Sequence, residues 1–185
     1  VEMMGGRIDV ESTPQVGSAF HFTMEFGRQK KAGRPTMAMP RRLKNIKVLV
    51  VDDNETARLL MRNILHGMGI LPTLVTSGSQ ALAVLRSAME KGGPFDLVFM
   101  DQRMRSMDGV ETIGRMRAFV DPPPRVVMLT AISRGEIERD VVGVGVDCIL
   151  QKPAGRIAVF NTILDLFGEG GARIPEEGQP AYAEQ

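Results

Sequence analysis

An uninterrupted apolar run that ends in a carboxylate restricts the fold of this chain more than any other feature. Residues 97–100 (LVFM) are all apolar, the next residue is Asp101, and a polar segment that contains Gly109 follows. Strands buried on both faces, as in a parallel sheet between helices, show this continuous pattern, whereas half-exposed strands alternate. The run therefore predicts a central strand of an α/β sheet with Asp101 at its carboxyl end. Ligands bind at that edge of open α/β sheets, although a single Asp can also do no more than cap the following helix.

Three other strand-like segments also lead into chemically useful side chains. Residues 47–51 lead into Asp52 and Asp53, residues 126–129 lead into Thr130, and residues 146–150 are followed by Gln151 and Lys152. If these strands are parallel neighbours, three carboxylates, a hydroxyl and an ammonium meet at one edge of the sheet. Clustered carboxylates repel one another and raise their own pKa values unless a cation joins them. The residue types therefore predict a hard divalent metal ion at this edge, together with Lys152.

Strand-like and helix-like segments alternate between residues 47 and 167. Expected strands are 47–51, 70–75, 97–101, 126–129 and 146–150, and expected helices are 54–66, 77–89, 108–119, 134–142 and 154–167. Five such βα units predict an α/β fold, a doubly wound five-stranded parallel sheet. Asn54 is expected to cap the first helix. The side chains of that helix expected to face the core are Ala57, Leu60, Met61, Ile64 and Leu65.

The flanking segments have a different pattern. Residues 7–11 (RIDVE) and 19–26 (AFHFTMEF) alternate apolar and polar side chains, which predicts a β-hairpin with residues 12–18 as its connection. Two strands alone are marginally stable, so this hairpin is expected to need a partner surface. Residues 27–46 are rich in Lys, Arg, Gly and Pro and predict a flexible basic linker. Residues 168–185 have too little apolar content to fold and predict a disordered tail.

Composition and charge exclude several classes of function. Residues 1–46 hold 8 Lys and Arg against 4 Asp and Glu, but the linker has no aromatic side chain to stack on bases, so no nucleic-acid partner is expected. No run approaches the roughly 18 apolar residues of a membrane span, and no signal peptide is recognisable. The only cysteine, Cys148, lies in an expected strand and rules out an internal disulfide. A reducing cytoplasm is the expected location.

Four motifs together resemble the receiver domain of two-component signalling proteins over residues 47–167. They are VLVVDDN, LVFMDQRMRSMDG, MLTA and QKP, and they occur in the family's order on the expected elements. The resemblance implies a flavodoxin-like sheet with the strand order 2-1-3-4-5. It also implies a cis peptide bond before Pro153.

The same resemblance implies a role for each motif. Asp101 is the expected phosphoacceptor, which receives a phosphoryl group from a phosphohistidine. The hydroxyl of Thr130 and the ammonium of Lys152 are expected to contact the phosphoryl oxygens. The expected Mg²⁺ ligands are Asp52, Asp53, Asp101 and the backbone carbonyl of Arg103.

Three positions depart from the family pattern. Arg105 stands where the family usually has proline, so a looser loop after Asp101 is expected. Ile149 stands where a Tyr or Phe usually reports phosphorylation by moving inward. Ile132 is apolar at a position whose side chain tunes hydrolysis of the aspartyl phosphate, which leaves the phosphoryl lifetime open.

Residues 1–26 resemble the last segment of the ATP-binding domain of sensor histidine kinases. Gly17 and Ser18 match the end of that family's second glycine box, while Gln15 stands where another glycine is usual. The acceptor histidine, the asparagine box and the first glycine box are absent, so this chain is not expected to bind ATP. The resemblance implies a piece of a hybrid sensor histidine kinase. The implied partners are the kinase's own catalytic and dimerisation domain or a histidine phosphotransfer protein.

Two other functions remain open from the residues alone. A Mg²⁺-dependent phosphatase with an aspartyl-phosphate intermediate needs a second acid two residues after the nucleophile, where this chain has Arg103. A pseudo-receiver that serves only as an interaction module is disfavoured by the complete set of acids, hydroxyl and lysine. A stand-alone regulator would not be preceded by residues 1–26, and a DNA-binding regulator would continue beyond residue 167.

Overall fold

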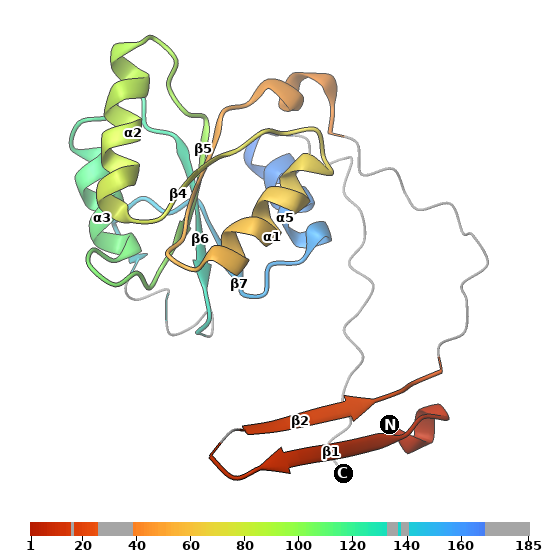
Figure 1. The fold of residues 1–185 in the computed structure, drawn as a ribbon. Coiled ribbons are helices and arrows are strands. Elements are labelled where there is room, and N and C mark those ends of the chain that lie inside the picture. The colour runs from red at the N-terminus through yellow and green to blue at the C-terminus, as the bar shows by residue number, and fades with distance from the viewer. Residues whose placement is uncertain (16, 26–38, 133–136, 138–140, 169–185) are drawn as a thin grey trace. The chain divides into compact units, whose positions relative to one another are not determined.

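The computed structural model describes residues 1–15, 17–25, 39–132, 137 and 141–168 (Figure 1). The chain divides into two compact units, one within residues 1–36 and the other within residues 37–185. No helix in the described ranges is both long and apolar enough to cross a membrane.

The first unit is the expected antiparallel hairpin. A short 3-10 helix, η1 (Glu2–Met4), precedes strands β1 (Ile8–Thr13) and β2 (Gly17–Phe22). Both strands reach further toward the turn than the sequence pattern indicates, and β2 ends at Phe22 instead of residue 26. The connection is short because Ser12 pairs with Ser18 and their hydroxyls lie 2.8 Å apart. Gln15 in the turn has φ 65°, a conformation that glycine adopts at lower cost.

The second unit is a five-stranded parallel sheet with the order β4-β3-β5-β6-β7, which confirms the predicted order 2-1-3-4-5. The expected helix over residues 134–142 lies mostly outside the described residues. The strands are β3 (Val48–Val51), β4 (Thr73–Val75), β5 (Leu97–Asp101), β6 (Arg125–Thr130) and β7 (Cys148–Gln151). The helices are η2 (Arg41–Asn45), α1 (Glu55–His66), α2 (Gly78–Glu90), α3 (Gly109–Arg117) and α5 (Arg156–Leu166).

Side-chain caps fix where three of these helices begin. Asn54 accepts a hydrogen bond from the backbone N–H of Ala57, as expected, and Ser77 and Asp108 cap α2 and α3 in the same way. Strand β4 is shorter than expected. The reason is that the N–H of Ile70 bonds to the carbonyl of Leu65, so Ile70 closes the end of α1 instead of opening the strand.

The sheet separates two core layers because successive side chains of a strand point to opposite faces. Helices α1 and α5 cover one face, and α2 and α3 cover the other (Figure 1). In α1, Met61, Ile64 and Leu65 face the sheet as expected, but Leu60 is 48% exposed, so its expected place in the core is wrong. Leu60 lies at the edge of the apolar stripe, where helical periodicity alone does not distinguish core from rim. Cys148 is half-buried and packs against the α1 and α5 layer.

The last residues of the expected linker belong to this core. Leu43 of η2 and Met39, which precedes this helix, are only 4% and 2% exposed and pack in the α1 and α5 layer. The basic residues around them hide this pattern in the sequence, because Arg41 and Arg42 make the segment read as solvated. A flexible linker therefore does not describe residues 39–46.

Candidate functional site

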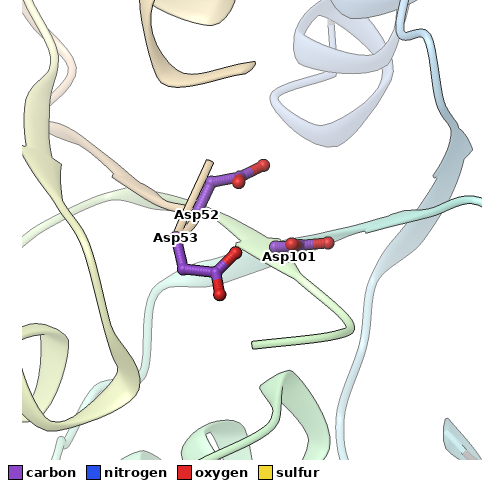
Figure 2. Close-up of side chains that lie close together, drawn as sticks. All are labelled: Asp52, Asp53 and Asp101. Atoms are coloured by element: carbon purple, nitrogen blue, oxygen red, sulfur yellow. The ribbon is translucent and has the colours of Figure 1, made fainter. Parts of the chain in front are cut away.

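Three carboxylates meet at the carboxyl edge of the sheet (Figure 2). Asp52 and Asp53 follow β3, and Asp101 ends β5. One oxygen atom of each carboxylate lies within 4.8 Å of the others. Asp52 and Asp101 are 1% and 7% exposed, and the side chain of Asp53 is 26% exposed. The sequence prediction that these three side chains converge is confirmed.

The pairing of β3 with β5 explains why the acids meet. Val51 pairs with Met100 in the parallel ladder, so the next residue of each strand, Asp52 and Asp101, reaches the same edge. The strand interiors are fully buried, which leaves little freedom in the register between them. Asp52 is held further by the backbone N–H of Asn54, which donates to its carboxylate at 2.8 Å.

Lys152 bridges two of the acids. Its Nζ lies 2.6 Å from Oδ2 of Asp52 and 3.0 Å from Oδ1 of Asp101. The backbone N–H of Lys152 donates to the carbonyl of Thr130 at 2.7 Å, which positions the lysine directly after β7. The peptide bond between Lys152 and Pro153 is cis, as expected.

Burial and neighbouring charges raise the pKa values of two residues of the site, Asp101 and Lys152. Burial raises the pKa of Asp101, and the neighbouring charge of Asp52 raises it further, while the hydrogen bonds from Lys152 and from the backbone N–H of Arg103 oppose the shift. Burial lowers the pKa of Lys152, but its hydrogen bonds to Asp52 and Asp101 outweigh that effect, and the pKa lies above its ordinary value. The two pKa values are therefore raised for different reasons, that of Asp101 mainly by burial and that of Lys152 by its hydrogen bonds to the two acids.

The donor set fits a hard divalent cation. Carboxylate oxygens are the ligands that Mg²⁺ prefers, and the negative charge that Lys152 leaves uncompensated favours a second cation. The backbone N–H of Arg103 contacts Asp101, which does not test the expected role of the Arg103 carbonyl as a ligand. That role stays a prediction.

Thr130 lies at the same edge but does not bond to the acids. Its buried hydroxyl donates to Oε1 of Gln102 at 2.5 Å and accepts from the backbone N–H of Ile132 at 3.1 Å. The sequence reasoning missed Gln102. The missing information was the strand register: Asp101 pairs with Leu129, and one further step along both strands brings Gln102 opposite Thr130.

Arg105 is a second residue whose contact the sequence reasoning missed. Its Nε lies 3.4 Å from Oδ2 of Asp53, and its side chain is 92% exposed. The proline-free loop was expected to be looser. Its two ends are nevertheless joined, because the N–H of Gly109 donates to the carbonyl of Gln102 at 2.9 Å.

An apolar cavity of about 430 Å³ opens beside the acids. Its wall includes Asp52 and Lys152 on the side of the cluster. The exposed Leu60 of α1 lies in its apolar part. The other apolar side chains of the wall are Val50, Ala57, Met61, Leu129, Pro153 and Ala154.

Comparison with known proteins agrees with this geometry. Residues 48–164 match the family model described as the response regulator receiver domain. The autoinducer 2 sensor kinase/phosphatase LuxQ of Vibrio vulnificus is 28% identical over 168 residues, which cover 89% of this chain and 19% of LuxQ. This chain therefore spans only a small part of the length of that relative.

Two solved structures share the fold. The receiver domain of the histidine kinase CKI1 from Arabidopsis thaliana, complexed with Mg²⁺, is 30% identical with a TM-score of 0.58, covering 65% of this chain and 91% of that one. A chain from the co-crystal of the Saccharomyces cerevisiae phosphotransfer protein Ypd1 with the receiver domain of Ssk1 is 25% identical with a TM-score of 0.57. That match covers 65% of this chain and 87% of the other.

Proposed function

The chain belongs to the family of response regulator receiver domains, which act in two-component phosphorelays, and we propose that Asp101 is the residue on which it accepts a phosphoryl group. The observation that carries this proposal is the position of the Asp101 carboxylate. It is nearly buried at the edge of the sheet, 3.0 Å from the Lys152 ammonium and beside two further acids. Burial removes competing water, and the ammonium is placed to offset the charge of a phosphoryl group.

The chemistry follows from the groups present. An oxygen of Asp101 attacks the phosphorus of a phosphohistidine, a P–O bond forms, and the P–N bond breaks with its electron pair left on the imidazole nitrogen. Lys152 pairs with a phosphoryl oxygen, and Thr130 donates its hydroxyl to another. Bound Mg²⁺ supplies positive charge against the transferring group. The residues proposed to hold it are Asp52, Asp53, Asp101 and the Arg103 carbonyl.

Labelling with a small phosphodonor tests the assignment. The protein is incubated with acetyl phosphate, with and without a chelator of divalent cations, and its intact mass is measured. One phosphoryl group is expected per chain, and none in Asp101→Asn or with the chelator. Asp108→Asn is the matched control, because Asn caps helices as well as Asp does and α3 keeps its cap. Labelling that survives Asp101→Asn would refute the proposal, and absence of all labelling would favour an interaction module.

The apolar cavity beside the acids is the proposed docking site for the phosphodonor. Receiver domains interact with histidine kinases or phosphotransfer proteins, as the complex of Ypd1 with Ssk1 illustrates. A histidine that delivers a phosphoryl group must approach Asp101 closely, and the exposed Leu60 offers apolar contact beside that path. We propose that a helix carrying the phosphohistidine packs against Leu60.

A pair of leucine variants tests this docking site. Leu60→Ala is expected to slow phosphotransfer from a phosphorylated histidine phosphotransfer protein by about tenfold, with labelling by acetyl phosphate unchanged. Leu71→Ala is the control, since Leu71 is 79% exposed and does not line the cavity. Equal loss with both phosphodonors would place the effect of Leu60 in the fold and not in docking.

The first unit supports a further proposal, that the chain is part of a hybrid sensor histidine kinase. Two cross-strand pairs, Ile8 with Phe22 and Val10 with Phe20, lie on one face of the hairpin because side chains two residues apart share a face. These four side chains are 50% to 68% exposed. The likeness to LuxQ also extends beyond residues 48–164, since it covers 89% of this chain.

Hydrogen exchange tests the kinase context. The amides of β1 and β2 are expected to exchange rapidly in this chain and at least about a hundredfold more slowly in the longer parent protein, where an ATP-binding domain would cover the apolar face. Amides of β5 serve as the internal reference in both samples. Equally fast exchange of the hairpin in the parent protein would contradict the assignment.

A further inference from the structure

The hydrogen bond between Thr130 and Gln102 indicates a function for Gln102, the residue that follows the proposed phosphoacceptor Asp101. We propose that Gln102 is a positioning residue that holds the Thr130 hydroxyl away from Asp101 and thereby opposes the phosphorylated arrangement. The inference rests on the proposed function, because it concerns how readily Thr130 is released to a phosphoryl group. The two residues are buried, at 8% and 1% exposure, and their side-chain oxygens lie 2.5 Å apart.

The alternation of the strands explains why Thr130 meets Gln102 and not Asp101. Side chains of β5 and β6 alternate between the two core layers, and the paired residues Phe99 and Val127 both face the α1 and α5 layer. Asp101 lies two residues beyond Phe99 and so shares its face, whereas Thr130 lies three residues beyond Val127 and belongs to the opposite face. The side chain of Thr130 therefore starts on the other face of the sheet from the acceptor, and its hydrogen bond to Gln102 keeps the hydroxyl there.

The backbone of Gln102 is held on both sides. Its N–H donates to the carbonyl of Leu129 at 2.9 Å, which extends the β5 and β6 ladder by one bond. Its carbonyl accepts from the N–H of Gly109 at 2.9 Å, which closes the loop after Asp101. A side chain on so fixed a backbone keeps its acceptor oxygen directed at Thr130.

A hydroxyl has one proton, so the two possible acceptors compete for it. When Thr130 donates to Gln102, it cannot donate to a phosphoryl oxygen, and release leaves the amide oxygen of Gln102 without this donor. Removing that acceptor should strengthen the binding of a phosphoryl mimic by about five- to tenfold, the usual effect of one neutral hydrogen bond. A ligand shifts such an equilibrium only through its different affinity for the two arrangements, and Gln102 contributes to that difference.

The test measures the affinity of beryllofluoride, a phosphoryl mimic, in the presence of Mg²⁺. The chain has no tryptophan, so calorimetry or amide NMR replaces the usual fluorescence assay. Gln102→Leu and Gln102→Met remove the acceptor at similar volume, and two variants guard against one that folds poorly. Both are expected to bind beryllofluoride about five- to tenfold more tightly than the wild-type protein. In the Thr130→Ala background, the same changes at Gln102 should have no effect.

Each result decides a separate question. Binding to the wild-type protein tests the proposed function, and its failure would remove the basis of this inference as well. Normal binding to the wild-type protein with unchanged affinity in both Gln102 variants would overturn the inference alone. An equal gain in affinity from the Gln102 changes in the Thr130→Ala background would also overturn the inference. Such a gain would come from a general loosening of the loop, which does not need the Thr130 hydroxyl. A shift of the Thr130 methyl resonance in unliganded Gln102→Leu is the expected direct sign of release.

Discussion

The Lys152 ammonium lies 2.6 Å from Asp52, a residue 100 positions earlier in the chain, and the same ammonium reaches Asp101. Lys152 thus acts as a counterion inside the acid cluster. A phosphoryl group that arrives at Asp101 brings negative charge to the same ammonium. The lysine is therefore placed to exchange one negative partner for another during the reaction.

Replacing Lys152 with Ala should separate metal binding from phosphorylation. Loss of the ammonium leaves three carboxylates without their counterion, so Mg²⁺ affinity is expected to stay the same or rise, while labelling by acetyl phosphate slows by at least about tenfold. Calorimetry gives the affinity, and intact mass over time gives the labelling rate. Mg²⁺ should also raise the melting temperature of Lys152→Ala at least as much as that of the wild-type protein.

Lys91→Ala is the control for this experiment, because Lys91 is exposed at the end of α2. A large loss of Mg²⁺ affinity in Lys152→Ala with normal labelling would show that the lysine supports the metal site and not the phosphoryl group.

Arg105 should weaken Mg²⁺ binding, because its guanidinium lies 3.4 Å from Asp53. The pair is exposed, so the effect is expected to be small, about two- to threefold tighter binding in Arg105→Ala at low ionic strength. High salt should abolish the difference, since exposed charges are screened. Arg103→Ala is the matched control in the same loop, because the change keeps the backbone groups of residue 103 and removes an exposed side chain that forms no ion pair with another described residue. A gain that persists at high salt would contradict competition for Asp53.

Gly109 is predicted to be essential for the geometry of the acceptor strand. A Cβ at this position would collide with the backbone oxygen of Asp101, and a backbone atom cannot move aside cheaply. Gly109→Ala should lower the free energy of unfolding by about 1–3 kcal/mol and slow labelling of Asp101. Gly114 lies on the exposed side of the same helix with open space around it. Gly114→Ala is therefore expected to raise the free energy of unfolding by about 0.5–1 kcal/mol. Urea unfolding compares the two, and equal stability of both variants would refute the steric argument.

The strands of the sheet could be predicted because strands buried on both faces have mostly apolar residues. The continuous apolar run before Asp101 and the paired acids after β3 identify central strands and their edge without knowledge of tertiary contacts. Boundaries were less accurate where a tertiary contact decides them. Ile70 looks like a strand residue but closes α1, and Leu43 looks like part of a basic linker but packs in the core.

The charged residues of the candidate site could be predicted from the sequence, whereas the hydrogen bond to the uncharged Gln102 could not. Asp52 and Asp101 stand out because each follows an apolar run directly, and Lys152 stands out because it comes two residues after the end of an expected strand. Gln102 carries no charge and is read as a loop residue unless the register of β5 against β6 is known. Arg105 was judged by the proline it replaces, and its reach across the loop to Asp53 depends on side-chain length in three dimensions.

Ile149 bears on how phosphorylation would spread through the domain. It is half-buried in β7, pairs with Met128 and packs against the α2 and α3 layer. A β-branched side chain is stiff at its first torsion, and Ile149 has no ring or hydroxyl that gains by moving between solvent and core. One usual source of a free-energy difference between the two states is therefore missing on this face.

We accordingly expect a phosphoryl group to perturb the loops after Asp101 and Thr130 more than strand β7. This pattern suits a relay domain that passes its phosphoryl group to another protein better than a domain that dimerises on phosphorylation. Amide NMR with and without beryllofluoride measures this. The largest shifts should fall in residues 102–109 and 130–132, with smaller shifts in residues 148–151. Ile149→Tyr supplies the missing ring and should enlarge the β7 shifts, because that ring can exchange between two positions. Wild-type shifts in β7 as large as those beside Asp101, together with dimerisation on phosphorylation, would show that Ile149 transmits the signal without an aromatic ring.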